Sequence, residues 1–258
     1  MSNIRLAFFG RLTNFVSLLE RRKTETKLTI FMRFLVFMLI MFGMTPLSVF
    51  AQSADVLLRK MVEALSSGQV GYAVSLFRQS CQTDGHQAEM FYWTGVDKSQ
   101  DTAPQFAREL AEYFKGVGNY SKAYLFYKEL LQYKPDSVEV LVSCAEMEVR
   151  CGQMGDAKET YEKVVALDSD NLQACNFLGS YYFLKSEDAR KKLDADFNRL
   201  SAPTRMQYAR YRNNLSSLFE SGYSKARLYL QQVLTLFPSS EVGKTLEKIN
   251  WVEREVNR

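Results

Sequence analysis

Histidine is nearly absent from this chain, and proline and glycine are scarce. The 258 residues include one histidine, five prolines and 13 glycines. A single histidine, His86, excludes any metal or catalytic site that needs a histidine pair. So few prolines and glycines favour long helices over a turn-rich β architecture. The composition, 47% hydrophobic and 24% charged, is that of a globular protein and excludes a disordered or collagen-like chain.

The basic character of the chain comes from its N-terminal segment. Residues 1–51 hold seven basic and two acidic side chains, which leaves 26 basic and 27 acidic side chains in residues 52–258. Nucleic-acid binders usually carry a basic excess, so the near-neutral body argues against a nucleic-acid partner. The one compact basic run in the body, Arg190-Lys191-Lys192, has acidic neighbours and predicts a solvated helix face.

An apolar segment near the N-terminus has the layout of a secretory signal. Arg33 precedes an uncharged run from Phe34 to Met44, and Val49 and Ala51 suit cleavage before Gln52. Signals carry a basic start, an apolar run of about 7–15 residues and small residues at the cleavage point. A spanning helix needs about 20 apolar residues. We therefore expect a cleaved signal peptide over 32–51 and export to the periplasm of a bacterial cell. The alternative is a retained inner-membrane anchor, the one case in which a membrane partner is expected.

Residues 1–31 are too long for an ordinary signal start. We interpret them as an upstream extension, with Met32 as the working start of translation. The alternative is a long cytoplasmic segment with an amphipathic stripe.

The chemistry-bearing side chains show no catalytic or metal-binding spacing. Cys81, Cys144, Cys151 and Cys175 contain no CxxC pair. Cys144 and Cys151, seven residues apart on one expected helix, are about 10 Å apart by helix rise, too far for a disulfide. We expect buried free thiols. No segment matches a motif with a catalytic mechanism, so the sequence predicts no enzyme, no metal and no cofactor.

Self-similarity with a 34-residue period is the main signal from residue 104 onward. Ala123 and Ala157 stand one period apart, each four residues before a tyrosine. The turn segment Gly118 to Ala123 (GNYSKA) returns as Gly222 to Ala226 (GYSKA), which is one residue short. Ahead of these turns, one helical face repeats at i, i+3, i+4 and i+7: Ala107, Leu110, Ala111 and Phe114; Leu141, Cys144, Ala145 and Glu148; Cys175, Leu178, Gly179 and Tyr182.

These residues resemble the tetratricopeptide repeat (TPR) family, whose 34-residue helix–turn–helix units stack into a superhelix. Asn171 to Tyr182 (NLQACNFLGSYY) is an especially good match to a first repeat helix. Glu148 departs from the family by replacing its usual aromatic residue. The second helix of the third unit, expected from about Glu187 to Leu200, is charged and out of phase. The resemblance implies an all-α fold, a TPR solenoid of about five helical pairs with a C-terminal capping helix.

The organisation expected after the signal starts with a degenerate unit. In chain order it comprises a degenerate first repeat over 52–80, an inserted segment over 81–103, repeats over 104–137 and 138–171, a repeat with an irregular second helix over 172–203, a TPR-like repeat over 204–238 and a capping helix over 239–258. The insert contains Phe91-Tyr92-Trp93. We interpret these aromatics as packing over the junction of the first two units, since they carry large burial area. The alternative is a ligand-contacting platform.

The resemblance also implies a binding site, because the first helix of each TPR unit lines the concave groove. The side chains expected there lie between the core positions: Gln105, Arg108, Glu112, Lys115, Glu139, Val142, Glu146, Arg150, Gln173, Asn176 and Ser180. Family members that clamp a C-terminal carboxylate use Lys and Asn where this chain has Arg108 and Glu112, so such a clamp is not expected. The groove carboxylates suggest a partner with basic residues.

The function expected from these observations is a non-enzymatic protein–protein interaction scaffold of the cell envelope, which binds a peptide or helix of its partner in the groove. One alternative is a membrane-anchored organiser of an inner-membrane complex. Another is a glycan-binding accessory protein that uses the aromatic residues of the insert or the pair Tyr208 and Tyr211.

Overall fold

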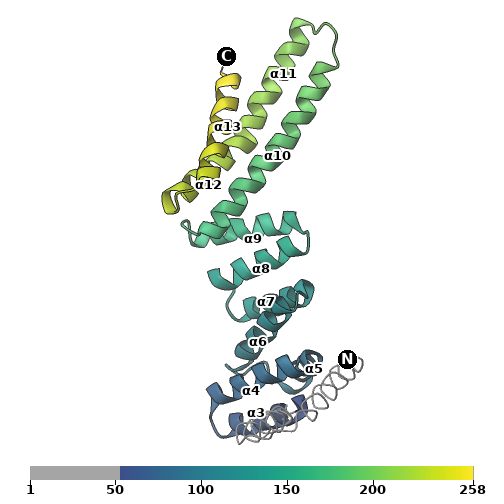
Figure 1. The fold of residues 1–258 in the computed structure, drawn as a ribbon, viewed down its shortest axis with the longest axis vertical. Helices are drawn as coiled ribbons and strands as arrows, with labels where there is room; N and C mark the ends of the chain where they lie inside the picture. The colour runs from purple at the N-terminus through teal and green to yellow at the C-terminus, as the bar shows by residue number, and fades with distance from the viewer. Residues whose placement is uncertain (1–52, 258) are drawn as a thin grey trace, which may run out of the picture. The chain divides into compact units, whose positions relative to one another are not determined.

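The computed structural model describes residues 53–257, and within them every regular element is helical. Figure 1 shows the helices stacked in chain order from α3 to α10, with α11 and α12 beside α10 and α13 against α11 and α12. The elements are α3 (Ala54–Ser66), α4 (Val70–Thr83), α5 (Gly85–Gly95), α6 (Ala103–Gly116), α7 (Tyr120–Tyr133), α8 (Val138–Arg150), α9 (Met154–Leu167), α10 (Leu172–Asn198), α11 (Arg205–Leu218), the π-helical segment η1 (Phe219–Tyr223), α12 (Ser224–Leu236) and α13 (Ser240–Val256). The predicted all-α TPR solenoid with a capping helix is confirmed.

The N-terminal predictions for residues 1–31 and 32–51 lie outside the described residues. Among residues 53–257, no helix combines the length and the hydropathy that crossing a membrane requires.

Three helical pairs, α3/α4, α6/α7 and α8/α9, share one turn geometry. Gly68, Gly118 and Gly152 have φ of 73°, 78° and 77°, the left-handed region that residues with a Cβ avoid. The residue after each glycine donates its N–H to the carbonyl five residues back, as Asn119 does to Phe114 at 2.9 Å. This Schellman pattern satisfies the last carbonyls of the first helix and reverses the chain.

We expect Gly118→Ala to lower the free energy of unfolding by about 1–2 kcal/mol, because the Cβ atom of alanine is crowded against the backbone in the left-handed conformation. The neighbouring Gly116 is helical and has open space around its Cβ position. Gly116→Ala is therefore the matched control and should cost nothing, since alanine is the better helix former. Urea unfolding of both variants measures the difference; equal effects would contradict the role assigned to Gly118.

The buried side chains form two clusters that meet at α8. The first cluster runs from α3 to α8 and includes Phe77, Phe106 and Phe126; the second runs from α8 to α13 and includes Tyr223 and Ile249. Helix α8 serves both, because Val140, Cys144 and Met147 belong to the first cluster and Leu141 and Ala145 to the second. The core is therefore continuous along the stack.

The insert contributes a helix of its own. Asp84 caps α5 by accepting the N–H groups of His86 and Gln87 at 3.1 and 3.0 Å. Helix α5 packs against α3, α4 and α6, and Tyr92 is fully buried. The interpretation that the insert packs over the junction of the first two units is confirmed.

The helices observed in the repeats predicted over 172–203 and 204–238 differ from those expected. The boundaries of these two repeats stay predictions. The prediction of a separate second helix that begins at Glu187 is wrong, because α10 continues without a break for 27 residues. The physical reason is the absence of a turn glycine: Gly179 is helical and packed against Leu230, and the next glycine is Gly222. No glycine is therefore available to end the helix near Glu187 as Gly118 ends α6.

The predicted turn at Gly222 is also wrong. Residues Phe219–Tyr223 form a π-helical segment that joins α11 to α12 without a reversal. In the earlier turn Asn119 follows Gly118 and caps the next helix, whereas Tyr223 follows Gly222 directly. With that residue missing, the helix continues, and a π-bulge accommodates the register. The stack therefore ends in a long hairpin of α10 against α11–η1–α12, covered by α13.

Candidate functional site

The residues predicted for the groove, here called the groove face, lie on α6, α8 and the first half of α10. The structure joins the α6 and α8 parts by ion pairs. Arg108 lies 2.5 Å from Glu139, and Lys115 lies 2.8 Å from Glu146. These contacts place the four side chains on one continuous surface across the two units.

A third ion pair extends this ladder to α4 and was missed in the sequence. Arg78 donates two hydrogen bonds to Glu109, at 2.6 and 2.7 Å. Glu109 is largely buried, and the bidentate geometry is the strongest form of such a pair. The spacing in the sequence could have predicted this pair. Arg78 precedes Glu109 by 31 residues, the same separation as between Arg108 and Glu139 and between Lys115 and Glu146.

The carboxylates of the groove face are already partnered. Glu139 and Glu146 hold the ion pairs above, and Glu112 accepts the Tyr127 hydroxyl at 2.7 Å. Burial and this carboxylate together raise the pKa of Tyr127 well above its usual value. Because each carboxylate has an internal partner, the expected preference for a basic partner loses its support.

Two hollows share Arg108 and Glu109 in their walls. One, of about 670 Å³, is lined from α4 and α6 and includes Cys81, Glu112 and Tyr113. The other, of about 650 Å³, includes Gln105 and residues from α4, the α5–α6 loop, α7 and the start of α8. Sites of this volume suit side chains of a bound segment.

The remaining predicted residues are more scattered. Arg150 lines a separate hollow of about 460 Å³ at the turns after α6 and α8. Gln173 donates to the Tyr161 hydroxyl at 3.1 Å, and Val142 is half-buried against the second core cluster. Asn176 and Ser180 are exposed on α10.

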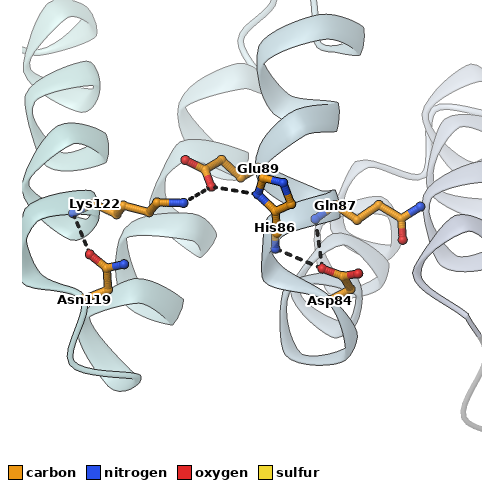
Figure 2. A network of polar contacts seen from close by, with 6 residues as sticks. All are labelled: Asp84, His86, Gln87, Glu89, Asn119 and Lys122. Carbon is orange, nitrogen blue, oxygen red and sulfur yellow. Dashed lines mark hydrogen bonds and ion pairs between the residues drawn. The ribbon is translucent and has the colours of Figure 1, made fainter.

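A network of polar contacts ties α5 to its neighbours (Figure 2). Lys122 of α7 lies 2.5 Å from Glu89, whose other neighbour is the exposed His86 at 3.8 Å. Gln87 donates to Asp55 of α3. His86 thus stands in a structural network, with its ring largely in solvent.

The aromatic residues of the insert surround a lysine. The Lys98 Nζ atom lies 2.7 Å from the ring centroid of Tyr92 and 4.4 Å from that of Trp93. Glu129 is 3.7 Å away and accepts the Tyr92 hydroxyl at 3.2 Å. Burial lowers the pKa of Lys98 to about 8, although Glu129 opposes the shift. Tyr92 is therefore a buried support for Lys98, whereas Trp93 is exposed and Phe91 is half-buried.

We expect Lys98 to make stability rise with pH between about 8 and 10.5. Below pH 8 the amine is charged in both states, and the folded state carries the burial cost. Above pH 8 the folded protein releases a proton that the unfolded chain still binds, so the free energy of unfolding increases. Urea midpoints between pH 7 and 10 should rise less in Lys98→Met than in wild type or in the exposed-lysine control Lys134→Met. Parallel curves for all three would contradict this assignment.

The cysteines differ in accessibility. Cys81, Cys144 and Cys175 are buried, as expected, whereas Cys151 is exposed at the turn after α8, which corrects the expectation that all four are buried. Burial raises the pKa of Cys81 and Cys144 to about 12, which makes them poor nucleophiles. Within residues 53–257, no group of three His, Cys, Asp or Glu side chains is placed to hold a metal ion.

Solved structures show what the chain is similar to. One is a protein of Bacteroides ovatus ATCC 8483 that is described provisionally as a protein-binding protein. It is 52% identical to this chain with a TM-score of 0.72, and the match covers 80% of this chain and 100% of that chain. A TPR repeats protein of Bacteroides fragilis NCTC 9343 is 14% identical over 77% of this chain and 98% of its own, with a TM-score of 0.39. A thermophilic TPR protein of Thermus thermophilus is 16% identical over 78% and 98%, with a TM-score of 0.31. These last two scores are too low for positions to be transferred. No protein-family model and no curated protein matches the chain.

Paired helices with left-handed turn glycines and a 34-residue period define a helical repeat protein of TPR type. The chain belongs to one family of such proteins with the Bacteroides ovatus protein, which it matches over that protein's whole length. This relationship and the fold support a protein-interaction scaffold with a protein or peptide partner.

Proposed function

We propose that the chain is a non-enzymatic scaffold of the cell envelope that binds a peptide or helix of a protein partner on the groove face. The observation that carries this proposal is the pair of hollows beside Arg108 and Glu109, of about 670 and 650 Å³. Both are bounded by helices from consecutive units, so their walls are pre-formed. A pre-formed site lowers the ordering cost of binding.

The electrostatics of the face favour recognition by shape and hydrogen bonding. The ion pairs of Arg78, Arg108 and Lys115 neutralise its carboxylates and hold α4, α6 and α8 in register. A partner segment would meet exposed amides and hydroxyls, such as Gln105, Asn176 and Ser180. The envelope location rests on the apolar segment Phe34 to Met44 and the small residues that follow it.

A cross-linking pull-down from envelope extract tests the site. The bait is residues 52–258, and the altered bait carries Gln105→Arg and Asn176→Arg, two exposed positions of the groove face. A matched control carries Gln132→Arg and Gln231→Arg, exposed positions on α7 and α12. We expect one dominant partner that the altered bait loses and the control keeps. A partner held equally by all three baits would place the site elsewhere.

The location has its own test. Carbonate extraction of cells that express the full chain should release a cleaved protein from the membrane fraction. Retention in the membrane would instead support the anchored alternative.

A further inference from the structure

The α10–α11 hairpin is bound to α13 only near its base, where Arg190 and Arg212 donate to the C-terminal end of that helix. Beyond these contacts the hairpin protrudes. Figure 1 shows α10 and α11 side by side, with their connecting loop at the end of the stack opposite to α3. Ser186 is the last buried residue of α10, and Leu215 is the first of α11. The arm, defined here as residues 187–214, therefore contains no buried residue. It extends by about 18 Å of helix rise beyond Ser186.

The arm is nevertheless an ordered structure. Phe197 stacks on Tyr211 with ring centroids 4.4 Å apart, and the Tyr211 hydroxyl donates to Asp194 at 2.8 Å. Thr204 and Gln207 form a capping box that begins α11 directly after the loop. These contacts hold the two helices together and present the loop between them in a defined shape.

Apolar side chains are exposed at this tip. Met206 is 82% exposed, Tyr208 52% and Leu200 37%. They flank a loop that also contains Ala202 and Pro203, and every residue from 198 to 210 is exposed. The tip is the closed end of a two-helix hairpin (Figure 1), a shape that suits insertion into a neighbouring surface.

Basic side chains surround the apolar tip. The arm holds seven basic and four acidic side chains, whereas residues 52–186 hold 13 basic and 18 acidic ones. Arg190, Lys191 and Arg199 have acidic partners. Lys192, Arg205 and Arg210 are exposed and have no ion-pair partner within the described residues. All three lie within about 10 Å of helix rise from the loop, comparable to the depth of a lipid headgroup layer.

We infer that the tip of the arm docks on an anionic lipid bilayer. Exposed Leu and Met side chains with a neighbouring Tyr and flanking Lys and Arg are the combination that lies in a membrane interface. Long basic side chains keep their charge at the headgroups while the apolar tip enters the acyl boundary. A protein partner would need a hollow that matches the tip, and a nucleic acid would leave Met206 and Leu200 in water. A bilayer takes up protruding apolar side chains without a pre-formed hollow. The inference does not depend on the groove face.

Vesicle flotation tests this inference with residues 52–258. That length is sufficient to fold, since the solved Bacteroides ovatus relative matches only 80% of this chain. The vesicles contain 30% phosphatidylglycerol in phosphatidylcholine, or phosphatidylcholine alone. Each basic side chain near an anionic surface adds roughly fivefold to binding, so Lys192→Gln/Arg205→Gln/Arg210→Gln should weaken binding about 100-fold. Leu200→Ser/Met206→Ser should weaken it about tenfold, since it removes the apolar insertion.

The matched control is Lys163→Gln/Lys244→Gln/Lys248→Gln, which removes the same charge from exposed positions outside the arm. It should bind as wild type, and thermal unfolding of all variants should agree within a few degrees because each position is exposed. Failure to float with anionic vesicles would overturn the inference, as would equal binding to phosphatidylcholine alone. Loss in the basic variant together with full binding by Leu200→Ser/Met206→Ser would also overturn it, since a purely electrostatic surface points to a nucleic acid or an acidic protein.

Discussion

Replacing Phe126 with alanine should lower the free energy of unfolding by about 3–5 kcal/mol, the usual cost of removing a fully buried phenyl ring. Phe126 is completely buried on α7. Its ring lies 5.8 Å from Phe114 of α6 and 5.5 and 5.4 Å from Tyr92 and Trp93 of α5. The side chain therefore joins the inserted helix to the second repeat, and a cavity there cannot close without moving α5.

Equilibrium urea unfolding measures this loss, and Phe237→Ala is its control. Phe237 is 60% exposed, so its truncation should cost less than about 1 kcal/mol. The native fluorescence of Trp93 should also change in Phe126→Ala, because its stacking partner is gone. A loss below about 1 kcal/mol in Phe126→Ala would contradict a rigid packing of the insert.

Replacing Glu148 with leucine should stabilise the protein, by about 1–3 kcal/mol. Glu148 occupies a core position of α8 where the TPR family usually has an aromatic residue, and it is 3% exposed. Its Oε2 atom is buried without a hydrogen-bond partner among the described residues. Burial first, and then the Glu148 carboxylate, raise the pKa of Tyr124 and of Cys144 to about 12. A buried carboxylate with an unpartnered oxygen is costly, and an apolar side chain of similar size removes that cost.

Glu146→Leu is the matched control on the same helix. Glu146 is partly exposed and paired with Lys115, so its replacement should give no gain in stability. Thermal unfolding should show a higher midpoint for Glu148→Leu and an unchanged or lower one for Glu146→Leu. A lower midpoint for Glu148→Leu would mean that the carboxylate has a structural partner that stabilises it.

Much of the fold was predictable because local signals repeat. Small residues such as Ala107 and Ala123 predicted the close helix contacts, and both are fully buried. The 34-residue period predicted two of the turns, one at Gly118 and one a period later at Gly152. In the first unit the left-handed residue is Gly68, five residues before Ala73, as Gly118 stands five residues before Ala123.

The candidate site was predictable only in part. Periodicity placed Arg108, Lys115, Glu139 and Glu146 on one face, and the structure brings these four together. Their pairing, the two hollows and the contribution of Arg78 from α4 depend on distances between units. A single sequence carries no such distances, because side chains 31 residues apart meet only after the helices stack.

The sequence by itself determined the helical class, the 34-residue period, the core positions and the turns at Gly118 and Gly152, since these depend on neighbours within one helical pair. Only the tertiary structure decided how the last units end. A missing residue after Gly222 and the lack of a glycine near Glu187 leave two continuous helices, which pack as a hairpin with a protruding arm. Both departures are visible in the sequence, but the sequence does not show whether the helix stops or continues at them. Whether a helix stops or continues depends on what it can bury against, and that is a property of the assembled stack.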